Sequence, residues 1–347
     1  MRAIRKLAPG PGAQLQQIPI PAVGPRDVLV QVMATSVCGT DYHIYAWDPW
    51  AAGRVKPPLT VGHEMAGEVV AVGADVTACK VGDYVSAETH IVCNNCPRCH
   101  VGEYHLCERT RILGVDTNGC FAEYVAVPEQ NIWINDKDIP WDLQSIQEPL
   151  GNAVHTAMAG ELTAKSVLVT GCGPIGIMSV PVAKMAGAEV VMAMDVNEYR
   201  LGLARELGAD LLINPTKEDP VEVVRKQTRG YGVDVVLEMS GNAGAIRQSL
   251  KAARNGARVS LLGLPSKPLE IDLAADVIMR GLVLQGITGR KMWQTWYQVR
   301  SLYRAGLAER LKPLITHRLP LEQVGTAMEL MASAECGKAV LMPGLKA

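Results

Sequence analysis

The chain has 347 residues, a length that favours two domains over one. Hydrophobic residues make up 48% and charged residues 20%, and the formal net charge of -1 offers no basic face for a nucleic acid. No apolar run is long enough to cross a bilayer, and the first residues are too charged for a secretory signal. We therefore expect a cytoplasmic protein with neither a nucleic acid nor a membrane as its partner.

The first part of the chain has the pattern of short strands divided by turns. Residues 27–33, 65–72 and 121–127 are rich in β-branched side chains and bounded by Gly, Pro or Asp. Such spacing predicts a small all-β barrel or sandwich domain, which we place at residues 1–150.

From about residue 143 the pattern changes to alternating helices and strands. The segments 166–170, 190–195, 233–239 and 257–262 are mostly apolar, and predicted helices such as 200–207 and 220–228 separate them. This alternation predicts a doubly wound parallel sheet covered on both faces, at residues 151–289. Residues 290–347 return to helices and a last strand, 339–342, and we expect them to rejoin the first domain.

A glycine-rich turn lies between the strand 166–170 and the helix expected at 174–185. Gly171, Gly173 and Gly176 form a G-x-G-x-x-G run, and Asp195 ends the next strand. This is the full dinucleotide fingerprint, in which the glycines let the backbone approach a pyrophosphate and the acid binds a ribose. Because Val196 is not basic, the pattern favours NAD over NADP. The alternative interpretation of this run is a turn that only tightens a strand–helix corner. Within the expected helix, Pro181 should cause a kink or loosen one of the hydrogen bonds.

Cysteines are numerous and unevenly placed. Of nine, four lie close together, Cys93, Cys96, Cys99 and Cys107. An odd total and tight clustering argue against a disulfide framework. Four thiolates at this spacing are typical of a structural zinc site with a closed shell. An iron–sulfur cluster or unmetallated cysteines are the alternatives, and the neighbourhood lacks the ferredoxin pattern.

A second set of possible metal ligands stands apart in the sequence. Cys38, His63 and a carboxylate such as Glu64 offer sulfur, nitrogen and oxygen, a mixed set suited to a catalytic zinc with an open position. Each residue alone also has an ordinary structural interpretation as a buried cysteine or a hydrogen-bonded histidine. From the residues alone both interpretations stay open.

The order of these motifs resembles that of the zinc-containing medium-chain dehydrogenases over essentially the whole chain. The motifs are C-G-T-D-x-H, then G-H-E, then four spaced cysteines, then the dinucleotide fingerprint. Three further stretches resemble the threonine-oxidising branch of that family: 43–50 (HIYAWDPW), 148–156 (EPLGNAVHT) and 195–200 (DVNEYR). The resemblance implies a GroES-like catalytic domain beside a Rossmann domain, in a homotetramer.

The resemblance also implies an activity and its cofactors. The activity is NAD-dependent oxidation of L-threonine to 2-amino-3-oxobutyrate, with one catalytic and one structural Zn²⁺ per subunit. Cys38, His63 and Glu64 would hold the catalytic zinc, with Glu148 near it. Further residues are implied to act on the proton, substrate or cofactor: Thr40 and His43 as a proton relay, His90 near the substrate, and Ile175, Asp195, Arg200, Leu262, Gly263, Leu264, Ile287 and Thr288 around the cofactor.

Three other functions remain to be compared with this one. A polyol or 2,3-butanediol dehydrogenase would share the zinc, NAD and mechanism and differ only in substrate. A non-catalytic zinc-binding module, of another class altogether, would bind no NAD. A zinc-free quinone reductase of similar architecture would not need Cys38, His63 and Glu64. Trp47 and Trp50 are open to two interpretations, a wall of the substrate pocket or aromatic packing.

Overall fold

The computed structural model describes residues 1–346, which separate into two compact units. The first unit is Met1–Pro149 together with the chain from Ile315 onward, and the second is Leu150–Leu314. The first boundary lies where the sequence indicates it. The second does not, because residues 290–314 pack with the second unit instead of returning to the first.

The reason for this difference is apolar burial. Trp296, Leu307 and Leu311 are buried, and the helical segments of 303–314 contact helix α6 (Pro174–Met185) of the second unit. A helix with an apolar face packs on the nearest layer that can cover that face.

The first unit is built mainly from strands. They are β1 (Arg2–Lys6), β2 (Gln14–Gln17), β3 (Asp27–Ser36), β4 (Leu59–Thr60), β5 (Glu64–Val72), β6 (Tyr84–Ala87), β7 (His90–Ile91), β8 (Arg111–Ile112), β9 (Tyr124–Pro128), β10 (Ile132–Ile134), β17 (Ile315–Pro320) and β18 (Lys338–Met342). Its helices are α1 (Gly39–Ala46), α2 (Pro49–Arg54), α3 (Pro97–His100), α4 (Trp141–Ser145) and α12 (Val324–Ser333), with the short helices η1 (Tyr104–Leu106), η2 (Glu129–Asn131) and η6 (Leu321–Gln323).

The main sheet of the first unit joins the two ends of the chain. Its strand order is β10-β6-β5-β3-β18-β17, with β9 also paired to β3. The long strand β3 is antiparallel to β5, β9 and β18, so it forms the centre of the sheet. Val30, Val32 and Val69 are among the buried side chains on these strands, and their β-branched chains suit the pleated surface.

The second unit alternates strands and helices. Its strands are β11 (Ser166–Thr170), β12 (Val190–Met194), β13 (Leu211–Ile213), β14 (Val233–Glu238), β15 (Ala253–Leu261) and β16 (Val283–Gly286). Its helices are α6, α7 (Glu198–Glu206), α8 (Pro220–Gln227), α9 (Ala243–Ala252), α10 (Gln294–Leu302) and α11 (Ala308–Leu311), with η3 (Leu273–Ile278), η4 (Tyr303–Leu307) and η5 (Lys312–Leu314). Helix α5 (Gln147–Ala157) begins in the first unit and ends in the second.

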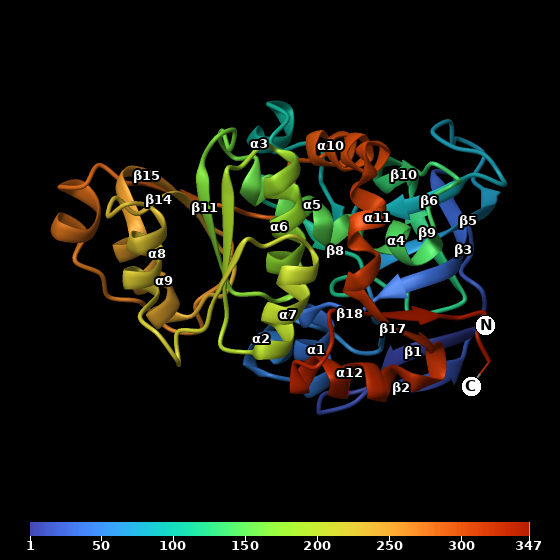
Figure 1. Ribbon diagram of the computed structural model, residues 1–347. Helices are drawn as coiled ribbons and strands as arrows, with labels where there is room; N and C mark the ends of the chain where they lie inside the picture. Colours follow the sequence, from blue (N-terminus) through green and yellow to red (C-terminus); the bar gives the residue numbers. More distant parts are fainter. Residues whose placement is uncertain (347) are drawn as a thin grey trace. The chain divides into compact units, whose positions relative to one another are not determined.

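The sheet of the second unit is parallel throughout, in the order β13-β12-β11-β14-β15-β16. This is the Rossmann order, and it confirms the predicted doubly wound sheet. Figure 1 shows α6 and α7 on one side of β11 and α8 and α9 on the other. No helix of residues 1–346 is both long and apolar enough to span a membrane.

Candidate metal and cofactor sites

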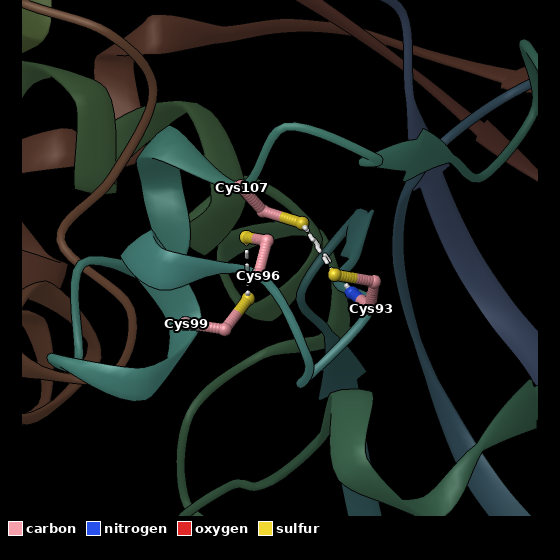
Figure 2. A group of neighbouring side chains, drawn as sticks. All are labelled: Cys93, Cys96, Cys99 and Cys107. Carbon is pink, nitrogen blue, oxygen red and sulfur yellow. Dashed lines mark hydrogen bonds between the residues drawn. The ribbon is translucent and has the colours of Figure 1, made fainter.

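The four clustered cysteines meet in the loop around α3. Their sulfurs lie within 4.8 Å of one another, with Cys96 Sγ 3.6 Å from Cys99 Sγ and Cys107 Sγ 3.5 Å from Cys93 Sγ. Figure 2 shows the four cysteines gathered around one space. None of them forms a disulfide. Four thiol sulfurs around one point fit the tetrahedral shell of a structural zinc.

The surroundings of these thiols favour a cation. The backbone N–H groups of Cys99 and Glu108 donate toward Cys96 and lower the pKa of its thiol to about 6. Burial raises the pKa of the Cys99 thiol to about 12, because a buried thiolate without a cation is unfavourable. A divalent cation at the centre would stabilise all four thiolates, and its binding would release the Cys99 proton.

The second group of metal ligands also comes together. The ligand atoms of Cys38, His63 and Glu64 lie within 4.8 Å of one another. Cys38 precedes α1, and Glu64 is the first residue of β5, with His63 directly before it. His63 and Glu64 are buried, whereas Cys38 is partly exposed. Such a set, closed on one side and accessible on the other, suits a metal with an open position.

One buried polar atom at this site has no protein partner. Glu64 Oε1 accepts no hydrogen bond among the described residues, whereas His63 Nδ1 and Asp41 Oδ1 face each other at 3.3 Å. A buried carboxylate oxygen without a partner is costly, so it indicates a missing ligand. The donor types and this oxygen together fit a zinc ion.

One charged group and one hydroxyl group behind the ligands, Lys338 and Ser36, hold Glu64 in place. Lys338 Nζ lies 2.5 Å from Glu64 Oε2 and donates a 2.8 Å hydrogen bond to the Val37 carbonyl. Ser36 Oγ also donates to Glu64 Oε2. Burial alone would lower the pKa of Lys338, but the charge of Glu64 outweighs it and raises that pKa. The pair therefore fixes one oxygen of Glu64 and leaves the other available.

Asp41 orients the other two ligands. Its Oδ2 accepts a 2.9 Å hydrogen bond from the Cys38 N–H, and its Oδ1 lies 3.3 Å from His63 Nδ1. Burial lowers the pKa of His63, but Asp41 and the Cys38 sulfur raise it well above its usual value in the metal-free state. A buried carboxylate beside a ligand histidine fixes its ring and tautomer, as metal sites generally require.

Glu148 and His90 lie outside this ligand group. Glu148 is buried in the first turn of α5 and is not among the three residues that come together. His90 begins β7, with its Nδ1 3.3 Å from Oε1 of the buried Glu88. Both residues therefore have a defined position outside the three-residue ligand group.

Thr40 and His43 lie one turn apart on α1, so their side chains share a face of that helix. His43 Nδ1 is 2.7 Å from Asp48 Oδ2, and its side chain is about half exposed. The backbone N–H of Ala51 and the His43 ring lower the pKa of Asp48. An ionised Asp48 holds a proton on Nδ1 and leaves Nε2 of His43 free to exchange one.

The two tryptophans of the 43–50 stretch have different surroundings. Trp47 is partly buried against the core of the first unit, and the Lys6 ammonium lies 4.7 Å from its ring centroid. Trp50 is exposed, with its ring centroid 6.1 Å from that of His43. The packing interpretation therefore fits Trp47, while Trp50 borders the histidine that is expected to exchange protons.

The glycine-rich turn of the second unit follows β11. Gly171 has a φ of +88°, which favours glycine, and Gly173 caps α6. A Cβ at Gly176 would lie 1.9 Å from the Gly171 carbonyl oxygen, so only glycine allows this close approach. Ile175 lies in the first turn of α6, and the helix continues through the buried Pro181. The turn places backbone N–H groups at a helix N-terminus, where a pyrophosphate binds.

Asp195 lies where the fingerprint predicts it, directly after β12. Its Oδ2 accepts a 2.6 Å hydrogen bond from the N–H of Cys172, and its Oδ1 accepts a 2.8 Å hydrogen bond from the N–H of Asn197. Cys172 is buried, which explains an apolar thiol in the turn. Arg200, on α7, has a buried Nε without a hydrogen-bond partner. An acid at this edge, with an arginine on the following helix, suits the adenosine side of a dinucleotide.

The remaining cofactor residues follow the next strands. Leu262, Gly263 and Leu264 come directly after β15, and the N–H of Leu262 donates 2.9 Å to the Glu238 carbonyl. Ile287 and Thr288 come directly after β16. Because carboxyl ends of parallel strands share one edge of a sheet, these residues lie on the same edge as the glycine-rich turn and Asp195.

Sequence reasoning missed several residues that complete these sites. Lys338, Asp41 and Ser36 surround the metal ligands, and Asp48 pairs with His43. Asp41 and Asp48 lie within the quoted motifs and could have been found there. Nothing in the sequence near Lys338 indicates that it reaches Glu64.

Comparison with known proteins agrees with this geometry. Residues 24–136 match the alcohol dehydrogenase GroES-like domain, and residues 174–305 match the zinc-binding dehydrogenase family. The chain is 82% identical to an L-threonine 3-dehydrogenase of Symbiobacterium thermophilum, over 100% of this chain and 99% of that protein. It is 51% identical to an L-threonine 3-dehydrogenase of Bacillus subtilis, over 99% of each.

Solved structures share the fold over nearly the whole chain. An alcohol dehydrogenase from Thermus sp. is similar with a TM-score of 0.87 and 31% identity, covering 99% of each chain. The 2R,3R-butanediol dehydrogenase from Bacillus subtilis is similar with a TM-score of 0.89 and 28% identity, again covering 99% of each. With two ligand groups of zinc type and a complete dinucleotide fingerprint, the chain belongs to the zinc-containing medium-chain dehydrogenases.

Proposed function

We propose that the protein oxidises L-threonine at its 3-hydroxyl to 2-amino-3-oxobutyrate, with NAD as the hydride acceptor. The observation that carries this proposal is the Cys38, His63 and Glu64 group in a chain 82% identical to an L-threonine 3-dehydrogenase. The identity to the 2R,3R-butanediol dehydrogenase is only 28%, which favours threonine over a diol.

The metal assignments follow from the donor sets. Cys38, His63 and Glu64 would hold a catalytic zinc, and the four clustered cysteines a structural one. A bound catalytic zinc supplies Lewis-acid chemistry that lowers the pKa of a substrate hydroxyl, and bound NAD accepts the hydride. Glu148 would act near this site without belonging to the three-residue group, and His90 would border the substrate.

The chain's own residues would move the proton. Thr40 accepts it at Oγ1 and passes it toward His43 on the same face of α1. Asp48 keeps His43 in the tautomer whose Nε2 faces away from the carboxylate, and the exposed ring exchanges the proton with water. This relay lets the site lose one proton for each substrate hydroxyl oxidised.

The residues at the end of the fingerprint favour NAD over NADP as the cofactor. The Asp195 carboxylate binds ribose hydroxyls and repels a 2′-phosphate, and the neighbouring Val196 carries no positive charge. Gly171, Gly173 and Gly176 would cradle the pyrophosphate. The other contacts would come from Ile175, Arg200, Leu262, Gly263, Leu264, Ile287 and Thr288.

Assembly and location belong to the proposal as well. Strand β16 ends the sheet of the second unit, and an unpaired edge invites a second copy. Large apolar side chains on or near that strand are exposed: Leu264, Leu273, Ile278, Met279 and Val283. We propose a homotetramer built through this edge, working in the cytoplasm, where nine free thiols persist.

The test is NADH formation, followed by absorbance, with L-threonine, sorbitol and 2,3-butanediol in parallel. We expect turnover with threonine that is lost after chelation and restored by Zn²⁺. Turnover with the diols alone would overturn threonine as the substrate and keep the dehydrogenase. Absence of NAD binding by the folded protein would favour a non-catalytic zinc-binding module.

A further inference from the structure

The first unit contains a cavity of about 400 Å³ that none of the proposed metal ligands lines. Its volume lies within the range of sites for small molecules. Much of its wall is apolar, formed by Ile18, Pro19, Pro21, Leu113 and Val125. Two arginines, Arg5 on β1 and Arg111 on β8, also line it.

Among residues 1–346, Arg5 forms no side-chain hydrogen bond and no ion pair. Its Nε is covered by protein, but the side chain as a whole is only partly buried, and its two terminal nitrogens are not among the covered atoms. An arginine stays charged in a protein, so these terminal N–H donors remain available to an acceptor that occupies the cavity.

Other polar residues line the same space. They are Asn118, Tyr124 and Thr117, although the Thr117 Oγ1 itself is covered by protein. Arg111 forms no ion pair among the described residues; the pKa of Asp116 is lowered chiefly by its hydrogen bond with Arg54, and the charge of Arg111 adds little to that. The single acid on the wall is Asp27, whose Oδ2 already accepts a hydrogen bond from the Gly24 N–H. The charged side chains that line the cavity are therefore predominantly positive.

We propose that this cavity binds a small monocarboxylate with an apolar body, at a site distinct from the dehydrogenase centre. A carboxylate matches the planar fork of a guanidinium, because its two oxygens can accept two parallel N–H bonds. An ammonium group, which acts as a point charge, would show no such preference. The proline and aliphatic walls would cover the apolar body. A fully charged ligand such as an inorganic phosphate would leave those walls without a partner.

Titration calorimetry of the intact, zinc-loaded protein tests the site with isovalerate as the probe. Isovaleramide, the neutral analogue of the same shape, is the control ligand. We expect one isovalerate per subunit, bound at least about tenfold more tightly than the amide, because a charged hydrogen bond contributes more than a neutral one. Equal affinities, or no saturable heat up to about 10 mM isovalerate, would overturn the proposal.

Three variants locate the binding. Arg5→Gln should weaken isovalerate roughly 10- to 100-fold, because it removes a charged donor. Arg26→Gln is the matched control, since Arg26 is an exposed arginine of the same unit, paired with Glu129 outside the cavity. Ala126→Leu fills the cavity while Arg5 stays in place, and it should also abolish binding. Wild-type affinity in both Arg5→Gln and Ala126→Leu would refute this site, whatever the dehydrogenase activity.

Discussion

Removing the ammonium of Lys338 should destabilise the first unit strongly. Lys338→Met takes away the group that lies 2.5 Å from Glu64 Oε2 and 2.8 Å from the Val37 carbonyl oxygen. The side chains of Lys338 and Glu64 are 2% and 0% exposed, so water cannot replace the lost partner. Methionine nearly fills the same volume, which keeps the packing term small. Breaking a buried ion pair costs about 3–5 kcal/mol, and we expect the free energy of unfolding to fall by that amount.

Urea-induced unfolding of the zinc-loaded protein measures this loss. With a slope of about 3 kcal/mol per molar urea, the midpoint should fall by roughly 1–2 M. Lys80→Met is the matched control, because Lys80 pairs with Asp83 at 2.9 Å but is 84% exposed, and a surface pair contributes at most about 1 kcal/mol. Equal midpoints for Lys338→Met and Lys80→Met would refute the buried pair.

Three further substitutions test the proposed sites. Cys38→Ser should lower turnover of threonine by more than about 100-fold while the circular dichroism spectrum stays that of the folded protein; retained turnover would contradict the catalytic zinc. Asp195→Ala should raise the Michaelis constant for NAD roughly 10- to 100-fold and that for threonine far less, since it removes charged hydrogen-bond acceptors; equal increases would count against the ribose role. Cys96→Ser should release one of two zinc ions per subunit, measured by atomic absorption, whereas Cys79→Ser, outside both ligand groups, should keep both; an unchanged metal content in Cys96→Ser would contradict the structural site.

The fold of the second unit could be predicted closely because its signals are local. The strand at 166–170 is a continuous apolar run ended by Gly171, and β11 has the same bounds. The glycine-rich turn and Asp195 were found from spacing alone, since Gly171 and Gly176 each answer a local steric need. The helix at 174–185 was predicted with the bounds of α6, although Pro181 lies inside it.

The packing of the later segments could not be predicted in the same way. The helices of 290–314 are amphipathic, but amphipathicity does not say which layer covers their apolar face. The structure packs them with the second unit. At the metal site, Cys38 and His63 stand in recognisable motifs, whereas Lys338 approaches Glu64 only because β18 pairs with β3. Long-range pairing of this kind has no signature in the residues around it.

The position of β18 has a consequence for how the protein is made. Strand β18 is synthesised only after the whole second unit, yet it lies between β3 and β17 and carries the lysine that neutralises Glu64. The second unit is continuous in sequence and can fold as soon as it is synthesised. The first unit must keep an open position in its sheet until residues 338–342 have been synthesised, with a buried acid still uncompensated. Nascent chains stalled before residue 338 would therefore expose apolar strands, which makes this interval the one most prone to aggregation.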